Sequence, residues 1–188
     1  IDKTYLSLDK AEERGFIHRD YLAHALRWSH VVKFMQEKQR YKDASILDIG
    51  CGKEAPLLKT LYTSRMLPGF YTGVDYGPID IFQNIPALQN QKPTIQLLPN
   101  TNFINVKIPE YNPDVIVMFE VLEHMEKDAG IKLLGHIKQF MSQQTTFFMS
   151  TPCYDGVNKA ANHVWERTYD QLEQELIYLG FKIVKTWG

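Results

Sequence analysis

The stretch of sequence that determines the fold of this chain is Ile46-Leu47-Asp48-Ile49-Gly50-Cys51-Gly52-Lys53-Glu54-Ala55. A short apolar run leads directly into two glycines and then into a stretch with helical spacing. Glycines are favoured at such a turn because a ligand there approaches the backbone more closely than a Cβ atom would permit. In open α/β sheets, ligands bind at the carboxyl ends of the central strands. We therefore predict that this strand, turn and helix form one wall of a binding site.

Short β-like runs alternate with longer amphipathic stretches along the rest of the chain. Several of these runs are apolar on both faces, which is typical of a parallel sheet covered by helices on each side. We expect strands at residues 45–49, 70–75, 95–98, 114–119, 145–150 and 181–187. We expect helices at residues 20–36, 55–66, 127–141 and 168–179, the last opening with the capping-box pair Thr168 and Gln171. Residues 77–92 are expected to be irregular or only briefly helical.

This alternation predicts an open, doubly wound α/β domain with a mostly parallel sheet. We assign residues 44–188 to that domain and residues 1–43 to an N-terminal helical extension. Extensions of this kind often cover the ligand crevice, and the candidates to line a substrate pocket are Tyr5, His18, Tyr21, Arg27 and Trp28. The histidines on or near the predicted helices are interpreted as ordinary structural or surface residues; these are His18, His24, His30 and His136.

Composition excludes several classes of function. With 188 residues, 44% hydrophobic and 23% charged, the chain suits one folded domain. A net charge of −1 without a long basic block disfavours a long nucleic acid as partner. No run of 18 apolar residues is present, so no membrane span is expected. The two cysteines, Cys51 and Cys153, are far apart and indicate reduced thiols in the cytoplasm. Because the chain begins with Ile and stops just after an apolar run, we expect residues to be missing at one or both ends.

A second acid follows the second expected strand. Asp75 lies 23 residues after Gly52, close to the spacing at which an acid accepts hydrogen bonds from ribose hydroxyls. The alternative is that Asp75 caps the turn before Gly77. The glycine turn also satisfies the dinucleotide pattern G-x-G-x-x-A, ending at Ala55. Asp48 argues against a dinucleotide, because a pyrophosphate gains nothing from a nearby negative charge, whereas a sulfonium amino acid does.

A group of acids and histidines follows the fourth expected strand. If the backbone turns helical there, Glu120, Glu123 and His124 share one face and can bind a divalent cation or hold a proton network. Acids in a first helical turn are also what the helix dipole favours. Loops after neighbouring strands four and five lie side by side over the crevice, so His163 is expected to complete the set.

These segments resemble the class I S-adenosylmethionine-dependent methyltransferases. The matching pieces are ILDIGCG, YTGVDYG and DVIVMFEVLEHM, in the family's order and spacing, and the resemblance covers residues 44–187. It implies that the methionine part of S-adenosylmethionine lies against the glycine turn, that Asp75 holds the ribose, and that the adenine is contacted after the third strand. The implied cofactor-binding residues are Asp48, Gly50, Cys51, Gly52, Asp75, Tyr76, Asn102, Phe103 and Glu120.

The E-x-x-E-H pattern with a downstream histidine is similar to two subgroups of that family. These are the O-methyltransferases of ubiquinone biosynthesis and the 2′-O-methyltransferases of small-RNA 3′ ends. The resemblance implies a divalent metal, Mg²⁺ or Mn²⁺, that binds vicinal hydroxyls of the acceptor. Its implied ligands are Glu120, Glu123, His124 and His163. Without a metal, His124 or His163 would serve as general base, oriented by Glu123 or Glu166.

The expected function is therefore O-methylation of a hydroxyl on a small molecule, sugar or nucleotide, with Glu123, His124 and His163 as catalytic residues. The alternatives are an RNA 2′-O-methyltransferase, a non-catalytic binding or assembly module with a degenerate methyltransferase fold, and a nicotinamide-dependent oxidoreductase. The resemblance also implies a final antiparallel strand that the chain lacks. We expect either further residues or a partner to complete that edge of the sheet.

Overall fold

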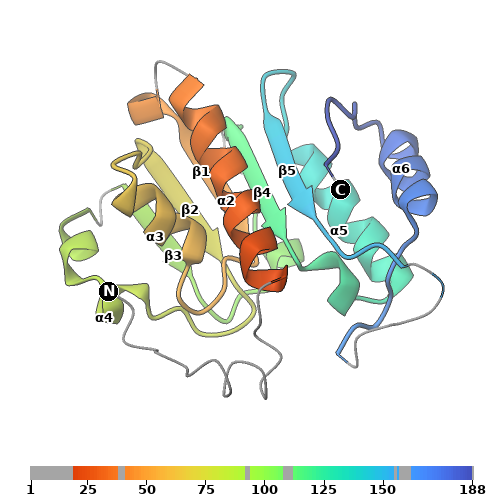
Figure 1. The fold of residues 1–188 in the computed structure, drawn as a ribbon, viewed down its shortest axis with the longest axis horizontal. Helices are drawn as coiled ribbons and strands as arrows, with labels where there is room; N and C mark the ends of the chain where they lie inside the picture. Colours follow the sequence, from red (N-terminus) through yellow and green to blue (C-terminus); the bar gives the residue numbers. More distant parts are fainter. Residues whose placement is uncertain are drawn as a thin grey trace.

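The sheet of this protein has five parallel strands in the order β3-β2-β1-β4-β5 (Figure 1). The computed structural model describes residues 19–37, 41–91, 94–107, 112–154, 156 and 162–187. The strand order reverses beside β1, where the chain crosses from the β2–β3 side to the β4–β5 side. The doubly wound α/β fold is thus confirmed. The strands are β1 Ser45–Ile49, β2 Phe70–Val74, β3 Ile95–Leu98, β4 Val115–Phe119 and β5 Thr146–Ser150.

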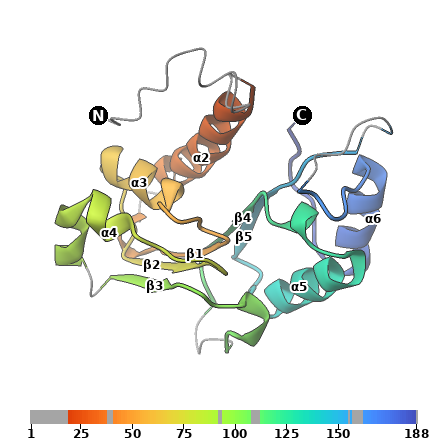
Figure 2. The ribbon, with the colours of Figure 1, turned by 90° about the horizontal axis from the view of Figure 1, so that it is seen from below.

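Helices cover both faces of the sheet (Figure 2). Two buried clusters of side chains hold them there. Consecutive residues of a strand point to opposite faces, so Ile46 of β1 packs beneath α2 and α3 while Leu47 packs against α5. The α-helices are α2 Arg19–Glu37, α3 Pro56–Thr63, α4 Ile81–Asn84, α5 Lys127–Gln139 and α6 Tyr169–Tyr178. The 3₁₀ helices are η1 Tyr41–Asp43, η2 Pro86–Gln91, η3 Phe103–Asn105 and η4 Leu122–His124.

Local sequence signals explain where two of these helices begin. α3 starts with Pro56, whose fixed backbone angle and missing N–H suit the first helical turn. α6 starts after Thr168, whose hydroxyl accepts from the Gln171 backbone N–H while the Gln171 side chain accepts from the Thr168 N–H. The predicted capping box is therefore confirmed. Within the described residues 77–91, the short α4 and η2 confirm that this segment is only briefly helical.

The prediction of a sixth strand at residues 181–187 is wrong. These residues form no strand, because the hydrogen-bonded ladder ends at β5 within the described part of the chain. Their apolar side chains serve other purposes: Phe181 lies 5.7 Å from Phe147 between ring centres, and Trp187 stacks on His30 at 4.3 Å. An apolar run of this kind satisfies the strand pattern without backbone pairing. That a partner completes the edge of the sheet beside β5 remains a prediction.

The predicted N-terminal helix is confirmed as α2, and it packs into the core. Val31, Val32 and Met35 are buried in the same cluster as Ile46 of β1 and residues of α3. The expected boundary between residues 43 and 44 remains a prediction. Tyr5, His18 and the side chain of Tyr21 lie outside the described residues. Among the helices that the structure describes, none is both long enough and apolar enough to span a membrane.

Candidate functional site

The glycine turn after β1 needs a residue without a side chain at Gly50. Gly50 has φ 71°, in the left-handed region, and a Cβ atom there would lie 2.3 Å from Cγ2 of Val121. Its backbone N–H donates to the Val74 carbonyl at 2.8 Å, which joins the turn to the end of β2. Gly52 also has a left-handed backbone, with φ 74°. The turn is therefore packed directly against the loop that follows β4.

Asp75 links the glycine turn to the end of β2 through both carboxylate oxygens. Oδ2 accepts from the Gly52 backbone N–H at 2.7 Å, and Oδ1 accepts from the Gly77 N–H at 2.7 Å. The second contact is the turn cap before Gly77, the alternative role of Asp75 that the sequence left open. Each carboxylate oxygen has a further lone pair, so these contacts leave acceptor capacity for a ligand. The ribose role of Asp75 remains a prediction.

A cavity of about 290 Å³ opens at the carboxyl ends of β1 and β4. It brings together five of the predicted cofactor residues, and α2 supplies its opposite wall through His24 and Trp28. The lining residues are His24, Trp28, Asp48, Gly50, Cys51, Gly52, Pro56, Leu57, Phe119 and Glu120. The other four predicted cofactor residues, Asp75, Tyr76, Asn102 and Phe103, are not among them.

The predicted adenine contacts have different environments. Asn102 is exposed, and its side-chain oxygen accepts from the Ile104 N–H at 3.1 Å. Phe103 is 5% exposed and packs against the rings of His136 and Phe140 at 5.3 and 5.0 Å. The side chain of Phe103 therefore belongs to the core. Tyr76 is 81% exposed.

Asp48 is a buried acid in the cavity wall. Its Oδ2 accepts a hydrogen bond from the hydroxyl of Tyr71, which is itself buried. Burial raises the pKa of Asp48 to about 7, and the negative charge of Asp75 acts in the same direction, while the Tyr71 hydrogen bond lowers it. Burial and the neighbouring Asp75 thus disfavour the charged form of Asp48, and the Tyr71 hydroxyl favours it.

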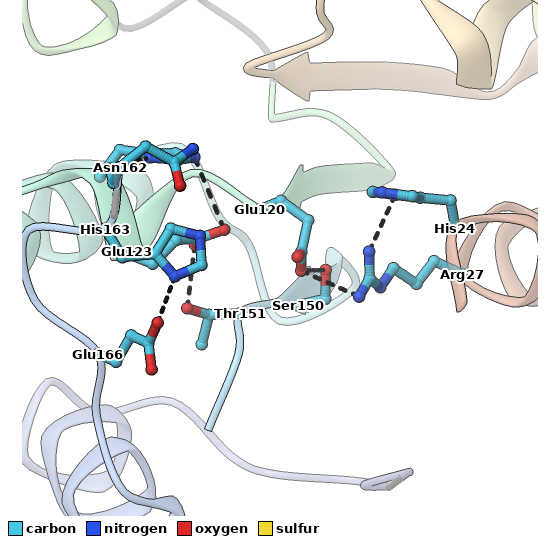
Figure 3. Close-up of polar contacts among 10 residues, drawn as sticks. His24, Arg27, Glu120, Glu123, Ser150, Thr151, Asn162, His163 and Glu166 are labelled. Atoms are coloured by element: carbon cyan, nitrogen blue, oxygen red, sulfur yellow. Dashed lines mark hydrogen bonds and ion pairs between the residues drawn. The ribbon is translucent and has the colours of Figure 1, made fainter. Parts of the chain in front are cut away.

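Glu123, His124 and His163 form a second group beside this cavity, and Figure 3 shows how Glu123 and His163 lie. One ligand atom of each residue lies within 4.8 Å of the others. Glu123 is fully buried, and its Oε2 accepts from the Thr151 hydroxyl at 3.0 Å, whereas Oε1 has no hydrogen-bond partner. The pKa of Glu123 is raised, mainly because the carboxyl group is buried. A buried carboxylate oxygen without a partner is costly, and a bound cation would satisfy it.

Both histidines of this group are held through Nδ1. His163 Nδ1 is hydrogen-bonded to Glu166, and His124 Nδ1 lies 3.1 Å from the carbonyl oxygen of Asn162. Metal-binding histidines usually have one ring nitrogen held in this way by an oxygen acceptor. The Nε2 atoms of both rings therefore remain for a ligand.

Glu120 does not belong to this group, and the expected helical face is wrong. Its φ of 54° takes the backbone out of the helical region, and only Leu122–His124 form a 3₁₀ turn. The Glu120 carboxylate instead contacts Arg27 of α2 at 3.2 Å and accepts from the Ser150 hydroxyl at 2.8 Å (Figure 3). Of the four residues predicted as metal ligands, the structure therefore groups three, which are Glu123, His124 and His163.

Sequence reasoning missed three residues near the site. Ser150 and Thr151, consecutive at the end of β5, each hold one acid of the loop after β4. Two consecutive hydroxyl residues at the carboxyl end of a predicted strand were the available signal. His24, interpreted from sequence as an ordinary residue, lines the cavity and lies 2.9 Å from Arg27. Its spacing from Arg27 and Trp28 on a predicted helix could have placed it with the pocket candidates.

Comparison with known proteins places this architecture in a family. A family model described as a methyltransferase domain matches residues 18–184. The chain belongs to this methyltransferase family. This favours methyl transfer over a nicotinamide-dependent reaction, and the subgroup with the E-x-x-E-H pattern remains a prediction. No curated protein matches the chain.

Solved methyltransferase structures share the fold. The 1,6-didemethyltoxoflavin-N1-methyltransferase of Burkholderia thailandensis is 18% identical, with a TM-score of 0.62, over 90% of this chain and 82% of that chain. Magnesium protoporphyrin IX methyltransferase of Synechocystis is 13% identical, with a TM-score of 0.65, over 88% and 77%. The small RNA methyltransferase HEN1 is 21% identical, with a TM-score of 0.65, over 84% of this chain and 21% of that chain. At these identities the likeness is one of fold.

Proposed function

We propose that this methyltransferase transfers the methyl group of S-adenosylmethionine to an oxygen atom of its acceptor. The cavity supports the choice of methyl donor. Asp48, Gly50 and Gly52 would hold the methionine part. The acid suits its ammonium and sulfonium charges, and the glycines let the ligand approach the backbone closely. Asp75 would accept hydrogen bonds from the ribose with its remaining lone pairs, and the exposed Asn102 amide would lie near the adenine.

The observation that supports oxygen as the acceptor atom is Oε1 of Glu123, which has no hydrogen-bond partner and lies 3.9 Å from Nε2 of His124, in a group that His163 completes. One carboxylate and two imidazoles form a donor set that suits Mn²⁺, Fe²⁺ or Zn²⁺ better than Mg²⁺, which prefers oxygen ligands. We therefore propose a transition metal here, with Mn²⁺ favoured over Mg²⁺. When bound, such an ion would lower the pKa of an acceptor hydroxyl and orient it.

The chain's own residues supply positioning. Thr151 holds Oε2 of Glu123, and Glu166 holds the ring of His163, so both side chains are oriented before an acceptor arrives. Methyl transfer depends on the alignment of the attacking oxygen with the sulfonium, and this kind of positioning supplies much of the rate. In the absence of an ion, His163 is the better general base, because Glu166 contacts it directly whereas Glu123 lies 3.9 Å from His124.

The proposed acceptor is a small molecule, sugar or nucleotide with two adjacent hydroxyls. Two neighbouring oxygens can bind one cation together, which selects vicinal diols over isolated hydroxyls. The net charge of −1 gives the chain no general attraction for a long polyanion.

Calorimetric titration with S-adenosylmethionine, then with Mn²⁺ or Mg²⁺, tests both parts of the proposal. We expect the cofactor to bind with and without chelator, and Mn²⁺ to bind more tightly than Mg²⁺. Transfer of labelled methyl to catechol or to a nucleoside with a free 2′,3′-diol should need the ion, and 2′,3′-blocked nucleoside should not react. Absence of cofactor binding would contradict methyl transfer and favour a non-catalytic module.

Two variants separate the metal from the fold. Glu123→Gln should abolish Mn²⁺ binding while the melting temperature of the metal-free protein stays the same or rises, because burial disfavours the charge of Glu123. Glu166→Gln should weaken Mn²⁺ binding by about 10- to 100-fold through the loss of the His163 contact. Glu37→Gln changes an exposed acid of α2 and should leave metal binding unchanged. Full activity after exhaustive chelation would exclude the metal.

A further inference from the structure

Asp48 and Tyr71 form a buried pair across two neighbouring strands. In the parallel register Asp48 lies opposite Gly73, and Tyr71 lies opposite Ile46, so both side chains are on the face of the sheet beneath α3. Asp48 is 4% exposed and Tyr71 1%. Gly73 leaves the space between them open, since a Cβ atom there would lie 3.2 Å from Cε1 of Tyr71. The Tyr71 hydroxyl donates to Oδ2 of Asp48, and Asp48 also lines the cavity.

We propose that Tyr71 is a positioning residue of the cofactor site, whose hydroxyl holds the Asp48 carboxylate as an anion facing the positive end of the bound cofactor. The proposal rests on the proposed function, because it takes S-adenosylmethionine as the ligand of the cavity. It adds a residue that does not line the cavity and acts only through Asp48.

The groups around Asp48 make the Tyr71 contact important. Asp75 directly after β2 and Cys51 of the glycine turn are two of these groups. Across the cavity they are His24 of α2 and Glu120 after β4. α3 contributes the uncharged Pro56 and Leu57. Asp75 and burial both disfavour the negative charge of Asp48, and the Tyr71 hydroxyl favours it.

The consequence is a cofactor affinity that depends on pH near neutrality. Burial raises the pKa of Asp48 to about 7 despite the contact with Tyr71. A cation that binds beside Asp48 favours its charged form, so binding releases a proton when Asp48 is protonated beforehand. S-adenosylmethionine should therefore bind more weakly below pH 7 than above it.

Calorimetric titration with S-adenosylmethionine between about pH 5.5 and 8.5, in two buffers that differ in ionisation heat, tests this. Tyr71→Phe removes a hydrogen bond to a charged group, which should raise the midpoint of the affinity curve by about one pH unit. Affinity should then fall up to about tenfold near pH 7 and return to the wild-type value at the alkaline end. Asp48→Asn should remove this pH dependence and the proton release together.

Matched controls distinguish positioning from packing. Tyr62→Phe removes a hydroxyl from a partly buried tyrosine of the same core cluster and should leave the midpoint unchanged. A purely structural role of Tyr71 would weaken binding equally at every pH. The same midpoint for Tyr71→Phe and wild type, or an unchanged pH dependence in Asp48→Asn, would overturn the proposal.

A second measurement keeps the two proposals separate. If the wild type binds no S-adenosylmethionine, the proposed function fails. Carboxyl ¹³C NMR of Asp48 then tests the pair without any ligand. Its titration midpoint should rise in Tyr71→Phe, and an unchanged midpoint would contradict the role of Tyr71.

Discussion

At the scale of single residues, the site contains two buried acids, Asp48 and Glu123. Burial raises the pKa of both. They differ in their partners: Oδ2 of Asp48 receives the Tyr71 hydroxyl, whereas Oε1 of Glu123 has no hydrogen-bond partner. A partnered acid with a pKa near neutrality suits a cationic ligand, and an unpartnered one beside two imidazoles suits a metal ion. The two buried acids therefore differ in the kind of ligand that each one suits.

Asp48 is expected to make the stability of the protein depend on pH. Its native pKa of about 7 exceeds the unfolded value of 3.8, so its contribution is fully present below pH 3.8 and is lost as pH rises to about 7. The loss is about 1.4 kcal/mol per pH unit. Urea denaturation of Asp48→Asn and wild type from pH 4 to about 8 should show a stability difference that increases in favour of the variant up to about pH 7 and is then constant. Parallel curves would contradict this.

Gly50 and Gly52 form a matched pair of positions that separates backbone strain from steric clash. Both have positive φ, which costs alanine about 1–2 kcal/mol. Gly52→Ala should lower the free energy of unfolding by that amount, because its Cβ would only contact Pro56 at 3.8 Å. Gly50→Ala should lose about 1–3 kcal/mol more, because its Cβ would meet Val121 at 2.3 Å. Equal losses in urea denaturation would show that Val121 moves aside freely.

At the scale of elements, one buried arginine ties the segment that carries His163 and Glu166 to two helices. Arg167 is 1% exposed, its Nε donates to Glu175 of α6, and its Nη2 donates to the Lys127 carbonyl at the start of α5 at 3.3 Å. Its backbone carbonyl also accepts from the Tyr154 N–H at 2.9 Å. Arg167 therefore links the segment after β5 both to α6 and to the start of α5, which follows the loop after β4.

Two glycines of α5 test this link. Gly130→Ala would place a Cβ 2.7 Å from Nη2 of Arg167, so it should destabilise the protein by about 1–3 kcal/mol despite the better helix propensity of alanine. In Gly135→Ala the new Cβ would contact only Leu179 at 3.9 Å, so this substitution should stabilise the protein by about 0.5–1 kcal/mol. Thermal denaturation measures both. A stabilising Gly130→Ala would show that Arg167 is not held firmly.

At the scale of the whole molecule, α2 serves the core and the cavity together. Its C-terminal half buries Val31 and Met35 against the sheet, and its N-terminal half places His24 and Trp28 in the cavity wall. Arg27 between them contacts Glu120 after β4. A change in the packing of α2 should therefore affect both stability and cofactor binding.

Met35→Ala tests whether α2 unfolds with the rest of the molecule. Removing this fully buried side chain should cost about 2–5 kcal/mol, with a single urea transition and an unchanged slope. Leu26→Ala is the control on the same helix, since Leu26 is 59% exposed and its loss should cost less than about 0.5 kcal/mol. A separate early transition in Met35→Ala would show that α2 is an independent unit.

The sequence by itself determined the α/β class, five strands close to their observed bounds, and the glycine turn with Asp48 and Asp75 at its edge. These follow from short apolar runs, helical spacing, glycine positions and capping pairs, which act over a few residues. The same local patterns predicted a strand at residues 181–187, where they failed because a strand also needs a paired neighbour.

Only the tertiary structure decided which polar groups meet. Glu120 lies apart from Glu123 because a positive φ turns it toward Arg27, and Tyr71 reaches Asp48 because two strands pair in one register. Burial, and with it the pKa of Asp48 and the unpartnered oxygen of Glu123, depends on packing from distant parts of the chain. No local sequence pattern contains those contacts, because each joins side chains that only the completed fold brings together.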